Sequence, residues 1–164
     1  MKSVISLLLT ALILFSFGSC NRQNVSYSDE LDCADLSEKA LQTIDATNTY
    51  ATANELFLAD YFQTPTYVND SVIRFASNSS NLNEIGIFHT TGGNAEEMAK
   101  LLKDYLLQSY EKNHAWYDSY MPAETPKLRD AEIRIYGNYV VYAILSKESR
   151  NTVFDFIENQ LRLS

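Results

Sequence analysis

The chain has 164 residues, of which 46% are hydrophobic and 21% are charged, and its formal net charge is −8. This length allows one domain with a substantial hydrophobic core but not two, and the composition is that of an ordinary globular protein. An acidic protein is repelled by nucleic acid and by anionic lipid, so we expect no nucleic-acid binding and no attachment to a membrane through charge alone.

The first twenty residues have the layout of a secretory signal peptide. Lys2 precedes an apolar run over residues 4–17, and two small residues come directly before Cys20. The run is too short and wrongly flanked for a membrane-spanning helix. Small residues before a cysteine resemble the lipobox of a bacterial lipoprotein, from which Phe17 departs because leucine is usual at that position. The alternative is an ordinary secretory signal with an incidental cysteine.

The resemblance to a lipobox implies three segments. Residues 1–19 would be removed as a signal peptide, residues 20–28 would be a tether carrying lipid such as palmitate on Cys20, and residues 29–164 would form a single globular domain. Two or more acyl chains give durable attachment. We therefore expect a protein anchored by lipid at the extracytoplasmic face of the cell membrane. Loss of Lys2 with the signal peptide would change the formal net charge from −8 to −9.

The domain is predicted to begin with helices. Residues 29–47 form the first, in which Cys33 falls in line with Leu36, Ala40 and Ile44 on one face. With Cys20 acylated, Cys33 has no cysteine partner for a disulfide, and we favour a small buried residue over a reactive thiol. A second short helical segment is predicted over residues 54–62.

The centre of the chain is predicted to be a hairpin followed by a long helix. Residues 70–77 and 84–88 alternate as strands, with a polar loop between them. The helix is predicted to begin at Ala95, with the side chain of Asn94 accepting a hydrogen bond from an early helix N–H, and to end before Met121.

A second unit of the same order closes the chain. Residues 130–136 and 139–146 flank a Gly-Asn pair, which is a strong hairpin signal, and residues 149–161 form the last helix. We predict an α+β fold with a four-stranded antiparallel sheet from two β-hairpins, each followed by a helix (ββαββα), preceded by the N-terminal helices. Both of the following helices are expected on one face of the sheet.

The second hairpin predicts two apolar faces. If Tyr136 faces Tyr139, one face carries five apolar side chains: Ile133, Ile135, Val140, Tyr142 and Ile144. Tyr136 and Tyr139 then project to the opposite face, which is too apolar to be plainly solvated. Either the N-terminal helices cover this face, which we favour, or Tyr136 and Tyr139 belong to a binding surface.

Three stretches carry a resemblance to a known family. They are EIGIF at residues 84–88, YMPAETPKLRDA at residues 120–131 and GNYVVYAILS at residues 137–146. Together with the lipobox, they resemble the family called domain of unknown function 4358, found mostly on secreted bacterial lipoproteins. The resemblance covers residues 31–161 and implies a location and a fold family, but no established activity and no catalytic residues.

The residues themselves offer few candidates for chemistry. His89 is predicted at a strand end beside two threonines and two glycines, where a nucleophile or a metal ligand could lie, but neither His89 nor His114 has a partner at metal-ligand spacing. The glycines before the long helix could bind phosphate, although Glu96 and Glu97 would oppose an anion there. We therefore predict no catalytic residues, no metal site and no cofactor.

Aromatic residues are the more unusual feature, because the chain has 11 tyrosines. Several lie between the long helix and the third strand, at Tyr110, Trp116, Tyr117 and Tyr120. Such stiff, amphipathic side chains suit the recognition of proteins or glycans. We therefore expect a binding module whose partner is a protein or another component of the cell envelope. The alternatives are an extracytoplasmic hydrolase using His89 with nearby carboxylates, and a structural subunit of an envelope or sporulation assembly.

Overall fold

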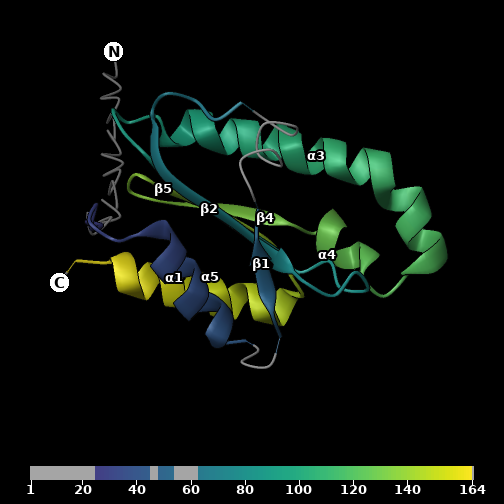
Figure 1. Ribbon diagram of the computed structural model, residues 1–164. Coiled ribbons are helices and arrows are strands. Elements are labelled where there is room, and N and C mark those ends of the chain that lie inside the picture. Colours follow the sequence, from purple (N-terminus) through teal and green to yellow (C-terminus); the bar gives the residue numbers. More distant parts are fainter. Residues whose placement is uncertain (1–24, 45–47, 54–62, 164) are drawn as a thin grey trace, which may run out of the picture.

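The computed structural model in Figure 1 describes residues 25–44, 48–53 and 63–163. The elements follow one another as α1 (Cys33–Gln42), β1 (Tyr50–Thr52), β2 (Val68–Ala76), β3 (Glu84–Thr90), α3 (Ala95–Tyr120), α4 (Thr125–Arg129), β4 (Glu132–Tyr136), β5 (Tyr139–Ile144) and α5 (Lys147–Leu161). The predicted signal peptide, Cys20 and the helical segment predicted over residues 54–62 lie outside the described residues.

The strands form one antiparallel sheet with the order β1-β2-β3-β5-β4. The α+β class and both hairpins are confirmed, but the prediction of four strands is wrong, because β1 pairs with the outer edge of β2. This strand has three residues, which is too short for an alternating pattern to stand out. The fold also includes the short helix α4, which was not predicted.

Helices cover both faces of the sheet (Figure 1). Helix α3 packs on one face, and α1 and α5 pack on the other. The expectation that both helices following the hairpins share a face is therefore wrong. The physical reason lies in β5, whose six residues are all buried, so that both faces of the sheet must be covered to keep water from apolar side chains.

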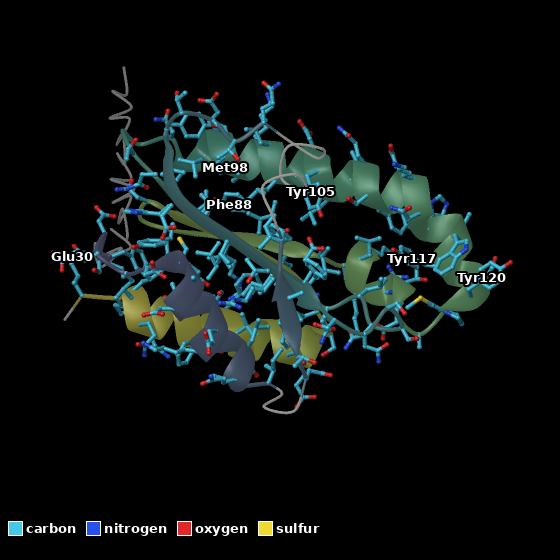
Figure 2. All side chains as sticks on the ribbon, in the orientation of Figure 1. Glu30, Phe88, Met98, Tyr105, Tyr117 and Tyr120 are labelled. Atoms are coloured by element: carbon cyan, nitrogen blue, oxygen red, sulfur yellow. The ribbon has the colours of Figure 1, made fainter. Side chains whose placement is uncertain are left out.

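The core under α3 is built from large side chains that lie across the central strands. Met98 and Tyr105 of α3 point toward Phe88 of β3 (Figure 2). The Phe88 ring stacks on Tyr142, with the ring centroids 6.4 Å apart. Gly86 makes this arrangement fit, because a Cβ atom there would lie 2.1 Å from the Tyr142 ring.

The N-terminus of α3 is as predicted in position but not in hydrogen bonding. Asn94 is the N-cap residue, but its side chain accepts no hydrogen bond from the helix. Instead its Nδ2 donates to the carbonyl of Thr91, at 2.6 Å. This bond closes the turn through Gly92 and Gly93, whose φ values of 66° and 77° favour glycine.

The core on the other face joins both ends of the domain. Leu36 and Ala40 of α1 meet Phe154 and Ile157 of α5 over the sheet. In α5, Phe154 is fully buried and Phe156 only partly, because α5 packs on the sheet through the face that carries Phe154.

The first and last described segments pair with each other. Tyr27 forms an isolated antiparallel bridge with Arg162, and the N–H of Ser28 donates to the carbonyl of Leu161 at 2.7 Å. Tyr27 also packs edge-on against Tyr136. Residues 26–28, which were predicted as part of the tether, therefore lie against the domain. Within the part of the chain that the structure describes, no helix combines the length and apolar character needed to cross a membrane.

Candidate functional site

Tyr136 and Tyr139, predicted either as covered residues or as binding residues, lie in the core beneath α1 and α5. Both are buried, and their hydroxyls are used internally, since Tyr136 donates to the carbonyl of Phe154 at 3.2 Å and Tyr139 to that of Leu31 at 2.6 Å. Burial raises the pKa of each hydroxyl to about 12. Neither side chain offers a surface to a ligand in this structure.

His89 lies at the end of β3, where it joins a polar cluster between the N-terminal segment and the second hairpin. Its ring stacks on Tyr139, with centroids 4.3 Å apart and an angle of 9° between the ring planes. Its Nε2 lies 3.5 Å from Oδ1 of Asp29, and its side chain is almost buried. Asp29 in turn accepts a hydrogen bond from Nδ2 of Asn138 at 3.0 Å. This carboxylate therefore connects the segment before α1 to the turn between β4 and β5.

A second carboxylate, Asp70, lies opposite His89 in the pairing of β2 and β3. Its Oδ2 accepts a hydrogen bond from the N–H of Cys33 at 2.8 Å, which holds the first turn of α1. Cys33 is fully buried, and burial, reinforced by the charge of Asp70, raises the pKa of its thiol well above the usual range. A thiol held protonated in this way is a poor nucleophile.

Other predicted candidates have structural partners. The His114 ring stacks on Tyr110 along α3, and its Nδ1 lies 3.0 Å from the Tyr110 carbonyl oxygen. Among the residues that the structure describes, no three His, Cys, Asp or Glu side chains are grouped so as to hold a metal ion.

An exposed aromatic cluster lies at the C-terminal end of α3. We call Trp116, Tyr117 and Tyr120 the aromatic tip. The Trp116 ring lies 5.1 Å from Tyr120 and 5.3 Å from Tyr117, measured between centroids. The tip is at the end of the molecule opposite Glu30 (Figure 2). Trp116 and Tyr120 are 54% and 71% exposed, which is unusual for side chains of this size in a protein with a closed core.

A groove between α3 and β4 was not predicted. It consists of two adjoining hollows, of about 500 Å³ and about 310 Å³, which share Lys103 and Ile133 in their walls. We call it the α3–β4 groove. The sequence placed Ile133 and Ile135 correctly on the α3 face, but the groove exists because β4 is an outer strand, and strand order could not be read from the residues.

A partly buried carboxyl group, that of Glu84, was also not predicted as a special site. Oε1 of Glu84 accepts hydrogen bonds from the hydroxyls of Tyr142, at 2.6 Å, and Tyr105, at 2.9 Å. Burial raises the pKa of Glu84, while these two hydrogen bonds oppose the shift. The three side chains link α3 to the two central strands.

The family relationship rests on most of this fold. A family model described as Domain of unknown function (DUF4358) matches residues 38–145, which run from the middle of α1 to the end of β5 and include the whole sheet. No curated protein and no solved structure matches the chain. Because the match spans more than half of the 164 residues, the chain belongs to the DUF4358 family, as the resemblance predicted.

Proposed function

We propose that the protein is a lipoprotein anchored through Cys20 at the extracytoplasmic face of the cell membrane, where it binds a protein or another envelope component without catalysing a reaction. The signal-like leader and the small residues before Cys20 support the anchor. Residues 21–25 would then connect the lipid to the chain where Ser26 begins to pair with the domain.

The aromatic tip is the observation that carries the binding proposal. Helix α3 has 26 residues and is therefore about 39 Å long, and it extends from the side of the molecule that holds residues 25–32 to the opposite end (Figure 1). A tether at the N-terminus would thus place Trp116 and Tyr120 far from the lipid. Clustered tryptophan and tyrosine side chains are typical anchors of recognition surfaces.

The test places a photo-crosslinking amino acid, p-benzoylphenylalanine, at Tyr120 of the full chain in the membranes of the producing bacterium. A matched protein carries it at Gln108, an exposed position on the same helix. We expect a defined adduct from position 120 that position 108 does not give. The same adducts from both positions, or none from position 120, would contradict recognition by the tip.

The anchor has its own experiment, because it can fail while binding holds. Cells grown with radioactive palmitate should label the wild-type chain and not the Cys20→Ala variant. Equal labelling of both chains would show that the lipid is attached elsewhere, and no labelling of either would leave an ordinary secretory signal as the explanation.

The alternative of a hydrolase using His89 has less support. The ring is stacked on Tyr139 and almost buried, and a substrate would have to displace Asp29 to reach Nε2. A role for His89 in holding the N-terminal segment accounts for the same contacts. The remaining alternative is a structural subunit of an envelope or sporulation assembly. Cross-linking at the tip distinguishes it, because a subunit of a stable complex would give adducts with the other subunits.

A further inference from the structure

Among the residues that the structure describes, none pairs as a strand with the outer edge of β4, and this edge is regular. Strand β4 ends the sheet and pairs with β5 without a register shift, and it contains neither proline nor glycine. Natural sheets usually protect such edges with bulges, prolines or a covering segment, since an open edge invites another strand to pair. Apart from its charged residues Glu132 and Arg134, β4 has none of these protections among the described residues.

The hairpin register shows which backbone groups face outward. Gly137 has a φ of 60° and Asn138 a negative φ, as in a type II′ turn, so Tyr136 and Tyr139 close a two-residue loop. Hydrogen-bonded pairs then alternate along the ladder, which leaves the N–H and C=O groups of Ile133 and Ile135 directed away from β5. No hydrogen bond from the described residues outside the sheet reaches these groups.

The same two residues line the α3–β4 groove. The larger hollow lies beside Ile133 and is walled by Leu106, Tyr110 and Leu128. The smaller lies beside Ile135 and is walled by Ala99. In an antiparallel pair, residues directly opposite each other direct their side chains to the same face. A strand added to β4 would therefore direct alternate side chains into the two hollows while its backbone bonds the open edge.

The charges along the groove indicate which kind of strand could pair with β4. Lys100 and Lys103 stand exposed along the groove and form no ion pair with a described residue. The carboxylate of Glu132 is held by Arg150, with 2.7 Å between Oε1 and Nη2, which leaves Glu96 at one end of the groove as the opposing charge. A second copy of this chain would bring its own Lys100 and Lys103 to the same side of a joined sheet, where like charges repel.

We infer that the α3–β4 groove binds an extended segment of a partner protein as a sixth strand on β4, with apolar side chains at alternate positions and a carboxylate beside Lys103. About five residues are sufficient, because β4 itself has five. Strand addition of this kind takes its affinity from backbone hydrogen bonds and its specificity from pockets for alternate side chains. The groove is separate from the aromatic tip, so this inference goes beyond the proposed function.

The first experiment measures binding of the fluorescein-labelled peptide Val-Thr-Val-Thr-Glu to the full chain in detergent micelles, because its two valines and its glutamate share one face of an extended strand and can meet the two hollows and Lys103 together. The charge-reversed peptide Val-Thr-Val-Thr-Lys is its control. We expect saturable binding of the acidic peptide, weakened about tenfold or more by Lys103→Glu and changed less than about twofold by Lys112→Glu. Lys112 is also an exposed lysine of α3, and it lies outside the groove. Absence of saturable binding, or equal loss in the two variants, would overturn the inference.

The second experiment tests the strand edge itself. Ile135→Pro removes an outward N–H without removing a hydrogen bond to β5, whereas Ile135→Val keeps that N–H and most of the side chain. We expect Ile135→Pro to abolish peptide binding, Ile135→Val to retain it, and the bound peptide to slow hydrogen exchange at Ile133 and Ile135. Sedimentation should show a monomer in micelles, and a dimer dispersed by Ile135→Pro would assign the edge to a second copy instead. Loss of binding in Lys103→Glu with unchanged cross-linking at Tyr120 would separate this site from the tip.

Discussion

The two faces of the sheet are covered to different extents. Five strands about 4.8 Å apart span roughly 19 Å, whereas a helix with its side chains is about 10 Å across. Two helices, α1 and α5, lie on one face. The long helix on the other face is α3, which packs over β3, β5 and β4, and the short helix α4 adds Leu128 at one end of this core. The difference explains why the α3–β4 groove lies beside α3. The face under α1 and α5 is closed by two helices, whereas the face under α3 keeps apolar side chains open to the α3–β4 groove.

The largest effect on stability is expected from a substitution in the core under α1 and α5. Phe154 is fully buried there, and Phe154→Ala should lower the free energy of unfolding by about 3–5 kcal/mol. The matched change on the other face is Leu107→Ala, where the side chain is 52% exposed and the cost should stay below about 0.5 kcal/mol. Urea denaturation followed by circular dichroism measures both. Similar losses for the two variants would remove the distinction between the faces.

A tight contact on the α3 face gives the next effect. Gly86→Ala would place a methyl group against the Tyr142 ring and force the ring to move, at a cost of about 1–3 kcal/mol. The shift should also disturb the hydrogen bond from Tyr142 to Glu84. The midpoint of urea denaturation measures the loss of stability. An unchanged midpoint would show that the Tyr142 ring can move away from the added methyl group without loss of stability.

The partly buried carboxyl of Glu84 predicts a pH dependence of stability. Burial raises its folded-state pKa above the ordinary value of 4.5, so the folded protein binds more protons than the unfolded chain between the two pKa values. Its contribution to the free energy of unfolding is therefore fully present below pH 4.5 and is lost as the pH rises through the folded-state pKa. Glu84→Gln keeps an oxygen for both tyrosine hydroxyls but cannot titrate.

The measurement is a series of urea denaturations between pH 4 and pH 8. The difference in stability between Glu84→Gln and the wild type should move in favour of the variant as the pH rises. A constant difference would show that Glu84 does not change its protonation on unfolding. Glu124→Gln, at a carboxylate that is ion-paired with Lys127, serves as a comparison away from the tyrosines.

The smallest effect on stability is expected at the aromatic tip. Trp116→Ala should change the free energy of unfolding by less than about 0.5 kcal/mol, because the ring packs on Tyr117 and Tyr120 at the surface rather than in the core. The same change should remove the cross-link from position 120. A large loss of stability would instead make the tip a structural cap for the end of α3.

Much of the fold could be predicted because its signals are local. Gly137 and Asn138 set the second hairpin and its register, and the register placed Ile133 and Val140 on the same face as found. The strand order could not be predicted, because it depends on the pairing of β3 with β5, whose partners run from His89 with Tyr139 to Glu84 with Ile144 and are distant along the chain. The face of the sheet on which α5 packs could not be predicted either. Strand β5 is apolar on both faces, so its sequence does not indicate which face α5 covers.

The candidate sites divide in the same way. The aromatic residues of the tip stood out by composition, and their exposure follows from their place beyond the sheet. The α3–β4 groove gave no signal of its own, because its walls look like core positions until β4 is known to be an outer strand. His89 attracted attention through its neighbours in sequence, yet its contacts are made by Asp29 and Tyr139, which are distant along the chain.

The pairing of residues 26–28 with the last turn of α5 has a mechanical consequence. If the chain is held in a bilayer at Cys20, any pull on the domain reaches the bridge of Tyr27 and Arg162 before it reaches the sheet. The bonds of Ser28 with Leu161 and of Leu163 with Ser26 would open first and lengthen the connection by several residues. A force applied at the aromatic tip would therefore separate residues 26–28 from the last turn of α5, while the sheet and its helices stay folded.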